Sequence, residues 1–456
     1  MVFGNALNFV SMERISATTT GATSTNWANN NLITRNSLDV AGNPIFGTPK
    51  SQNSVLKSPT VLTQLNLDEL LKYFDEITLT YLGSPYIIGE YPYGNILSVP
   101  SGKTLNIEPG VVLKFVASSV PGYGSSLEIN GTLRAIGEET KPITFTRFEE
   151  STGTHWLGIY FSFSSQNSIL DWVIIENARS WDSAHFAIKV DQSSVSFKNL
   201  TIENYYNRWG ILLINSPSII ASSTFSEFID TGQGSEPSAI YIIQGNPTIE
   251  NSIFKKNTCG INIEQGASPI IEGNYFEENK YPIYALDSYP SLTGNQFLRN
   301  DVNGILIFGN LSRDTTWKAG ITYVIDYYVG VMASTTLTIE PGTIVKFKAA
   351  SGAPGYQAYF QVAGSLIATG IENSKIVFTS FNDDEYGGDT NNDGTSTTPN
   401  YWDWKEITFT SGSSGSLKWA IIRYGGWFTN NPLVIQEGAN VNVSQENVII
   451  EFSSQP

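Results

Sequence analysis

The sequence holds few of the residues that cross-link proteins or bind transition metals. Its 456 residues include one cysteine, two histidines and three methionines. The single cysteine, Cys259, cannot form a disulfide within the chain, and we expect it to pack in the interior. Two histidines and three methionines are too few for a copper site built from clustered His and Met ligands.

Charged residues are also scarce, at 15% of the chain, and acidic residues outnumber basic ones to give a net charge of −16. This balance disfavours nucleic acids and anionic membranes as partners, and it permits neutral glycans and divalent cations. No apolar run is long enough to span a membrane. The first residues lack a basic region and are not a signal peptide as they stand. A low-charge composition rich in Ser, Thr and Asn indicates an extracellular, cell-surface protein.

Three segments between residues 247 and 300 repeat in register. The interval is 22 residues from Pro247 to Pro269 and 21 residues from Pro269 to Pro290. A repeat this short, rich in Ile, Phe and Asn, is typical of a solenoid whose coils each contain three short strands. Three columns keep the register: an aliphatic column, a Phe column and an Asn column, namely Ile249, Ile271 and Leu292, then Phe254, Phe276 and Phe297, then Asn257, Asn279 and Asn300.

We expect the aliphatic and Phe columns to form the apolar interior. The Asn column should lie at a bend, where stacked amides can hydrogen-bond along the axis as a ladder. The alternative is an antiparallel sandwich, which does not maintain three aligned columns.

A second repeat has a much longer period. The segment LNIEPGVVLKF at 105–115 recurs as LTIEPGTIVKF at 337–347, and LDWVII at 170–175 recurs as LKWAII at 417–422. The chain therefore divides into an N-terminal segment (1–79), a first module with regular coils (80–310) and a second module (311–456). In the Glu-Pro-Gly turns, Pro ends strand pairing and Gly permits the sharp bend.

The coil pattern I-x-x-N/S-x-F-x-x-N, followed by G-I, resembles the repeat of pectate-lyase-like proteins. The long module resembles one that recurs in secreted and surface-attached bacterial β-helix proteins. These resemblances imply an all-β fold, a right-handed parallel β-helix with three strands per coil, but they do not define a function because one scaffold hosts many tasks.

The N-terminal segment contains two candidate helices. Residues 62–74 carry Leu67, Leu70, Leu71 and Phe74 at helical spacing, and we interpret this segment as the cap that covers the open end of the β-helix. Residues 5–15 are a weaker candidate and faintly resemble the start of pilin-like proteins. That resemblance suggests attachment to a pilus or cell wall through the N-terminus.

An acidic loop, NDDEYGGDTNNDG at 382–394, is present only in the second module. Asp389, Asn391 and Asp393 follow the Asp-x-Asn-x-Asp-Gly spacing that directs alternate oxygens at one calcium ion. Asp383, Asp384 or Glu385 could complete the ligand shell. We therefore predict a structural calcium ion, although an EF-hand would place Glu where Asn400 stands. The alternative is a solvated acidic loop.

Aromatic residues make up 12% of the chain, and several follow the Asn position of a coil. Stacked coils would align them as a strip of rings whose faces pack on sugar C–H groups. The predicted carbohydrate-binding residues are Trp181, Tyr205, Tyr206, Trp209, Tyr281, Tyr284, Tyr289 and Trp427. The alternative is that loops cover these rings.

The sequence contains no Gly-His-Gly or Arg-Ile-Lys segment of the kind found in pectin hydrolases of this fold, and no catalytic residues are predicted. We expect a non-catalytic adhesin for an insoluble, cellulose-like polysaccharide, most similar to the tāpirins, which are cellulose-binding surface proteins. Two alternatives remain: a polysaccharide lyase or glycoside hydrolase, and a structural surface-layer or filament subunit.

Overall fold

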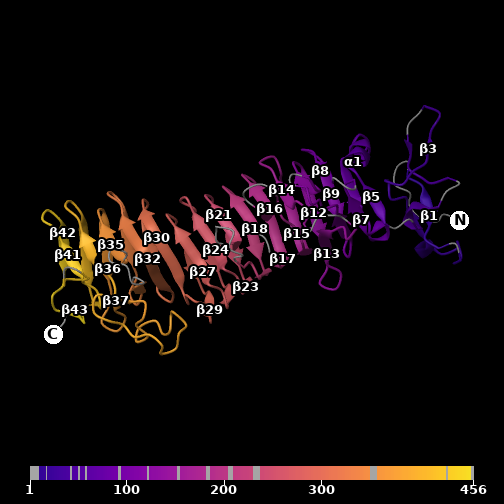
Figure 1. Ribbon diagram of the computed structural model, residues 1–456. Helices are drawn as coiled ribbons and strands as arrows, with labels where there is room; N and C mark the ends of the chain where they lie inside the picture. The colour runs from indigo at the N-terminus through magenta and orange to yellow at the C-terminus, as the bar shows by residue number, and fades with distance from the viewer. Residues whose placement is uncertain are drawn as a thin grey trace. The chain divides into compact units, whose positions relative to one another are not determined.

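The computed structural model describes residues 10–16, 18–41, 44–49, 52–56, 59–90, 94–120, 123–150, 155–180, 185–203, 209–229, 237–349, 357–427 and 430–452. The chain forms two compact units, residues 1–224 and 225–456. Most of their labelled elements are β-strands (Figure 1). This division differs from the module boundary at residue 310, because the regular coils from residue 225 onward pack with the second module. The module boundary describes the sequence repeat and stays a prediction. None of the helices among the described residues has the length and apolarity needed to cross a membrane.

The start of the first unit consists of short antiparallel pairs. Strand β1 (Met12–Arg14) pairs with β2 (Trp27–Asn29), and β3 (Ser37–Leu38) pairs with β4 (Pro44–Ile45). The prediction of a helix over residues 5–15 is therefore wrong in its described part. The reason is tertiary: the Glu13 carboxylate is buried and accepts hydrogen bonds from Asn30, Thr48 and Ser54, which hold β1 in place.

The predicted helix within residues 62–74 is confirmed as α1 (Gln64–Leu71). Thr63 is its N-cap and forms a capping box with Asn66. Gln64 protects the edge of strand β8 (Ile96–Val99): its side chain accepts a hydrogen bond from Ser98 N at 2.6 Å and donates one to Ser98 O at 3.2 Å. Among the pairings of the described strands, β8 pairs only with β11, so this contact satisfies peptide groups at an exposed edge.

The remaining strands of the first unit pair in parallel and form three stacks of strands, each of which we call a strand column. In the first column, β6, β9 and β12 are followed by the first halves of β15 and β17 and then by β19. In the second, β5, β7, β10 and β13 are followed by the second halves of β15 and β17. The third contains β8, β11, β14, β16 and β18. The bounds are β5 Thr60–Leu62, β6 Glu76–Leu79, β7 Tyr86–Ile88, β9 Thr104–Ile107, β10 Val112–Phe115, β11 Ser126–Ile129, β12 Thr132–Ile136, β13 Ile143–Arg147, β14 Ile159–Phe161, β15 Ser168–Ile175, β16 Phe186–Asp191, β17 Val195–Glu203, β18 Trp209–Ile214 and β19 Ile219–Ala221; β20 (Thr224–Ser226) lies at the division between the units.

The described strands of the second unit form three sheets. The continuous sheet runs from β21 through β24, β27 and β30 to β32 and then along two branches, one of β34, β37, β40 and β43 and one of β35, β38 and β41. The ending sheet contains β22, β25 and β28 beside β23, β26 and β29. The starting sheet contains β31, β33, β36, β39 and β42.

The bounds in the second unit are β21 Ser238–Ile243, β22 Thr248–Glu250, β23 Ile253–Lys255, β24 Cys259–Glu264, β25 Ile270–Glu272, β26 Tyr275–Glu277, β27 Tyr281–Leu286, β28 Ser291–Thr293, β29 Gln296–Leu298, β30 Ile305–Leu311, β31 Thr315–Trp317, β32 Thr322–Val331, β33 Thr336–Ile339, β34 Ile344–Phe347, β35 Tyr359–Val362, β36 Ser365–Thr369, β37 Ile376–Ser380, β38 Ile407–Phe409, β39 Ser414–Lys418, β40 Ala420–Arg423, β41 Leu433–Ile435, β42 Asn440–Val443 and β43 Val448–Glu451.

The predicted columns of the second unit are confirmed. Phe254 and Phe276 are fully buried and their rings stack 4.9 Å apart with an interplanar angle of 12°. The stack continues to Phe297 at 5.3 Å, although Phe297 is only half-buried because β29 ends its sheet. The aliphatic column is buried throughout and pairs in register from Ile249 to Ile271 to Leu292. Cys259 is buried as predicted.

The Asn ladder is also confirmed. Asn257 Nδ2 donates to Asn279 Oδ1, and Asn279 Nδ2 donates to Asn300 Oδ1, each at 2.9 Å. Each amide oxygen also accepts the backbone N–H of the Asn one coil earlier. A second, unpredicted ladder joins Asn274 to Asn295. Buried amides therefore fix the spacing of the coils at two corners.

Both copies of the long module contain the same buried tryptophan. Trp156 and Trp404 are fully buried and stack on Phe115 and Phe347 at 4.0 and 3.9 Å. Each indole N–H donates to a backbone carbonyl, that of Glu176 and that of Arg423. The long-period repeat is thus a repeat of structure as well as of sequence.

We expect Asn279→Ala to lower the free energy of unfolding by about 2 to 4 kcal/mol, since it leaves several buried groups without partners. The groups that lose a partner include Asn257 Nδ2 and Phe254 O. Urea unfolding of the purified chain measures the change. The control is Asn440→Ala on the exposed face of β42, which should change stability by less than about 0.5 kcal/mol. Equal effects of the two substitutions would contradict a stabilising ladder.

Candidate functional site

The predicted aromatic residues that the structure describes are not all exposed. Trp181, Tyr205 and Tyr206 lie outside the described residues. Trp209 is only 8% exposed because it begins β18 and pairs with Phe186 in β16, so the expectation that it is exposed is wrong. A role of these four residues in binding stays a prediction that the structure does not test.

The other four predicted rings lie in the second unit. Tyr281 and Tyr284 are in strand β27 rather than in a bend, and their ring centroids are 6.5 Å apart. Both pack, half-buried, against a cluster of Val302, Leu306 and Val324. Tyr289 follows the end of β27, and Trp427 follows β40 and donates its backbone N–H to Trp404 O. Among the predicted carbohydrate-binding residues that the structure describes, Tyr281 and Tyr284 are therefore the pair whose rings lie close to each other.

A more exposed aromatic group, not predicted from the sequence, lies further along the continuous sheet. We call Phe308, Tyr327, Tyr328 and Tyr359 the aromatic row. Phe308 lies 5.1 Å from Tyr328, and Tyr328 stacks on Tyr359 at 5.6 Å with an interplanar angle of 17°. Tyr327 touches Phe308, Tyr328 and Tyr359 and is 38% exposed. Burial and the neighbouring Tyr327 and Tyr328 raise the pKa of Tyr359, which therefore remains a neutral phenol.

A register shift between β30 and β32 creates this row. Ile307 pairs with Ile325, but Gly309 pairs with Val329, so three residues of β32 lie opposite Phe308. Such bulges re-aim side chains, and this one places Tyr327 and Tyr328 on the outward face. The insertion could not be seen in the repeat pattern. The residues of β32 on either side of Asp326, Tyr327 and Tyr328 are all buried, so the partly exposed pair Tyr327-Tyr328 is recognised only in the structure.

Polar side chains run beside the aromatic row on the same outward face. Asn310 pairs with Gly330, Gly330 with Gln361 and Gln361 with Thr408. Because Gly330 has no side chain, no side chain projects from the sheet between Asn310 and Gln361. Asn310 Nδ2 donates to the Tyr328 hydroxyl at 3.3 Å, and Lys405 Nζ lies 5.4 Å from the Tyr359 ring. We call Asn310, Gln361 and Thr408 the polar row.

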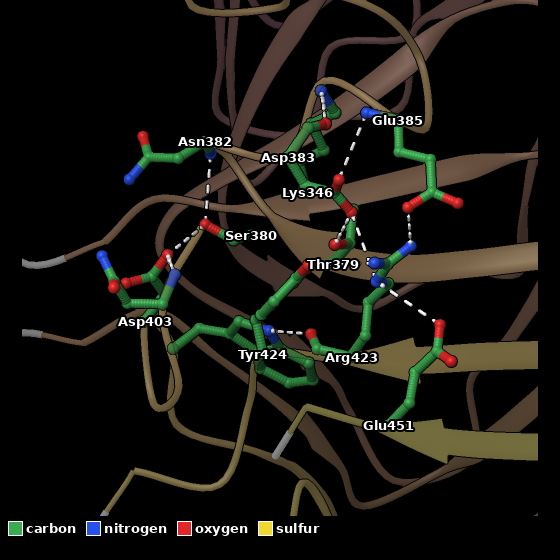
Figure 2. Close-up of polar contacts among 12 residues, drawn as sticks. Lys346, Thr379, Ser380, Asn382, Asp383, Glu385, Asp403, Arg423, Tyr424 and Glu451 are labelled. Atoms are coloured by element: carbon green, nitrogen blue, oxygen red, sulfur yellow. Dashed lines mark hydrogen bonds and ion pairs between the residues drawn. The ribbon is translucent and has the colours of Figure 1, made fainter. Parts of the chain in front are cut away.

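The acidic loop begins after β37 and is anchored on the continuous sheet by two buried cations. The Lys346 ammonium is fully buried and donates to Asp383 O and Gly388 O, each at 2.9 Å. Arg423 is only 3% exposed and donates to Glu385 at 2.7 Å, while Asp383 and Glu451 lie within 3.6 Å of its Nε (Figure 2). The loop is therefore held by the protein's own cations at its base.

The predicted calcium ligands are partly occupied by hydrogen bonds. Asp383 is buried and accepts from Thr379 Oγ1. Asp389 accepts from Asp393 N at 3.0 Å and Gly394 N at 2.9 Å, and Asp393 accepts from Asn391 Nδ2 at 2.8 Å. Among the described residues, no three His, Cys, Asp or Glu side chains converge closely enough to hold a metal ion.

Two buried side-chain oxygens at the loop nevertheless have no hydrogen-bond donor described for them. Asp384 Oδ1 and Asn391 Oδ1 are buried and have no hydrogen-bond partner among the described residues. Burial and the carboxylate of Asp389 raise the pKa of Asp384, so the loop gathers negative charge around this group. A hard cation with oxygen ligands would satisfy both atoms. Calcium at Asp383, Asp384, Asp389, Asn391 and Asp393 stays a prediction.

A family model described as a right-handed β-helix region matches residues 186–319. Among solved structures, the chain is similar to the Dettilon tailspike protein (9% identity, 82% of this chain, 64% of that chain, TM-score 0.28). It is also similar to a tailspike protein of E. coli bacteriophage HK620 in complex with a hexasaccharide (13% identity, 89% of this chain, 78% of that chain, TM-score 0.35). A third similar structure is PfbA, a surface adhesin of Streptococcus pneumoniae (12% identity, 85% of this chain, 89% of that chain, TM-score 0.29). The chain thus spans less than two thirds of the Dettilon tailspike. No curated protein matches.

The family match and the parallel strand register identify the fold as a right-handed parallel β-helix, as predicted. The resemblance to tāpirins stays a prediction.

Calcium should raise the melting temperature of the chain, because a ligand bound only to the native state stabilises it by mass action. Asp384→Asn should abolish this response. In chelator the same variant should melt at or above the wild-type temperature, since it removes a charge that its acidic neighbours disfavour. Differential scanning calorimetry with calcium and with chelator gives both comparisons. An unchanged wild-type melting temperature, or an intact response in Asp384→Asn, would exclude this site.

Lys346 should make stability rise above pH 8. Burial lowers the pKa of its ammonium to about 8, although Asp383, Asp384 and Asp389 oppose this shift. An unfolded lysine keeps its proton to about pH 10.4, so between these values the unfolded chain binds more protons and stability rises with pH. Between about pH 7.5 and pH 10 the wild type should gain on the order of 2 to 3 kcal/mol relative to Lys346→Met.

Urea unfolding of both chains across this pH range measures the difference, in which tyrosine titration common to both cancels. A difference that does not change with pH would mean that the buried amine keeps its proton.

Proposed function

We propose that this chain is an extracellular, cell-surface protein that binds a neutral polysaccharide of cellulose type without cleaving it. The observation that carries the proposal is the aromatic row beside the polar row on the outward face of the continuous sheet. Ring faces pack on the C–H surfaces of sugars, while phenol edges and amides bond to hydroxyls. The composition supports a surface location, since charged residues are few and the net charge is −16.

The geometry favours an extended glycan over a compact ligand. Residues in neighbouring parallel strands recur about 4.8 Å apart, so both rows run straight across the strands, the aromatic row from β30 to β35 and the polar row from β30 to β38. A flat, extended chain can place rings on the aromatic row and hydroxyls on the polar row along this direction. Lys405 is the described cation that contacts a ring of the row, and Glu406 lies 3.6 Å from its ammonium, so this contact brings too little positive charge to select a polyanion.

Beside the aromatic row, the described residues include one acid–base pair, Lys405 and Glu406, whose Nζ and Oε1 atoms form an ion pair at 3.6 Å. An ion pair of this kind is not by itself evidence of cleavage. Lys346 has a pKa suited to a general base, but its ammonium is fully buried and both hydrogen bonds described for it go to loop carbonyls. A lyase or hydrolase is therefore the second candidate, and chromatography of the polysaccharide after incubation distinguishes it by the release of oligosaccharides. A filament subunit would assemble without binding polysaccharide. Attachment through the N-terminal segment stays a prediction.

The test is retention on insoluble cellulose, with xylan, chitin and pectin beside it. We expect the double variant Tyr327→Ala/Tyr359→Ala to bind about 30-fold more weakly, since each ring contributes about 1 kcal/mol. Added salt should have little effect, because no ion pairing is involved.

Matched controls are Tyr401→Ala and Tyr123→Ala, which remove exposed rings elsewhere and should leave retention unchanged. Thermal melting checks that every variant is folded. Undiminished retention by the double variant, or loss of binding in high salt, would refute the proposed surface.

A further inference from the structure

Strands β28 and β29 are the last strands of the ending sheet in the second unit. Among the pairings of the described strands, β28 pairs only with β25 and β29 only with β26. The next strand in the chain on this side, β31, pairs only with β33 and belongs to the starting sheet. A cavity of about 500 Å³ lies between β28 of the ending sheet and strands β31 and β33 of the starting sheet. Its size is within the range of small-molecule sites, which is roughly 300 to 1,000 Å³.

The floor of the cavity is the outward face of the starting sheet. Leu337 and Ile339 are buried in the interior, so their alternating neighbours Thr336 and Thr338 face outward and line the cavity. Thr316 pairs with Thr338 and lies beside it in β31. The floor is therefore lined by hydroxyl groups.

One acidic and one basic side chain flank these threonines. Asp314 accepts a hydrogen bond from Thr336 N at 2.7 Å through Oδ1, which orients its carboxylate. Lys318 is exposed, and no described group pairs with its ammonium. The charges of these two lining residues balance, and the Arg313 guanidinium on the Tyr289 ring adds one positive charge nearby.

The wall of the cavity is the free edge of β28. Ser291 N donates to Pro269 O, and Thr293 O accepts from Gly273 N, each at 2.9 Å, so both residues direct these groups toward the preceding coil. In a parallel strand the peptide groups of alternate residues point to opposite sides, and those of Leu292 therefore point toward the cavity. This edge presents one N–H donor and one C=O acceptor above the hydroxyl-lined floor.

Tyr289 completes the corner and is held rigidly. Its hydroxyl accepts a hydrogen bond from Ser312 N at 2.8 Å and contacts Ser312 Oγ at the same distance. The Arg313 guanidinium lies 4.4 Å from the ring centroid and also donates to Gly266 O. The ring is thus a fixed aromatic surface at the cavity. Its role in carbohydrate binding stays a prediction.

We propose that this cavity binds a short neutral saccharide, as a site separate from the aromatic row. A fixed ring, several hydroxyls, a balanced pair of charges and one peptide edge are the groups that recognise a sugar's C–H faces and hydroxyls. The assignment of the ligand class rests on the proposed function, since it takes the same glycan as the aromatic row. A polysaccharide bound to the aromatic row would then have a second point of attachment on the protein, at this cavity.

An added peptide strand fits the cavity less well. Strand addition gains affinity from a series of main-chain hydrogen bonds. The free edge of β28 is three residues long and is preceded by Pro290, which has no N–H group. Only Leu292 offers both a donor and an acceptor on this side, which is too few for a stable added strand.

The test uses the full chain carrying Tyr327→Ala/Tyr359→Ala, so that the aromatic row does not contribute. Cellotetraose and xylotetraose are titrated into this chain by isothermal calorimetry. We expect saturable binding of at least one of them, and we expect Thr316→Val/Thr338→Val, added to the same chain, to weaken it by about tenfold through the loss of two hydroxyls.

Valine is favoured in strands, so this variant should fold, and Thr369→Val in β36 is the matched control that should leave binding unchanged.

Binding that survives the Thr316→Val/Thr338→Val change, or no tetrasaccharide binding by the host chain, would overturn the proposal. Neither result bears on the proposed function, which is measured by retention of the otherwise wild-type chain on insoluble polysaccharide. A six-residue peptide of alternating Thr and Val serves as a second probe. Binding of this peptide without any tetrasaccharide would identify strand addition and would also overturn the proposal.

Discussion

The interaction on which this structure depends is the in-register pairing of each coil with the next. Parallel strands force equivalent residues of successive coils to lie directly above one another, so every position becomes a column. A buried column must then be compatible with itself. Phe254 and Phe276 satisfy this by stacking, and Asn257, Asn279 and Asn300 satisfy it because each amide both donates and accepts along the axis. A single unmatched residue in such a column leaves its neighbours on both sides without partners.

The surfaces proposed to bind glycans arise where this register is interrupted. The irregular pairing of β30 with β32 turns Tyr327 and Tyr328 outward to form the aromatic row. The end of pairing at β28 opens the cavity and exposes the peptide groups of Leu292. The acidic loop is a third departure, an insertion whose base is held by Lys346 and Arg423 in the second module only. Regular coils supply rigidity, and irregular positions supply accessible groups in fixed places.

The regular part could be predicted from the sequence because columns are visible as periodic letters. The Phe and Asn columns follow directly from the spacing of the short repeat. The site could not be predicted in the same way. Trp209 looked exposed because it follows an Asn position, yet strand β18 begins at that residue and buries it. The strand at Met12–Arg14 depends on a carboxylate, Glu13, whose partners lie up to 42 residues away in sequence.

A crystal structure of the chain soaked with a soluble cello-oligosaccharide such as cellohexaose tests the central claim most directly. The sugar rings should lie across the strands with their faces on Tyr328 and Tyr359 and their hydroxyls toward Asn310 and Gln361, and the oligosaccharide should be intact. Ordered sugar bound only away from the aromatic row, or a cleaved product in its place, would contradict non-catalytic binding at this surface.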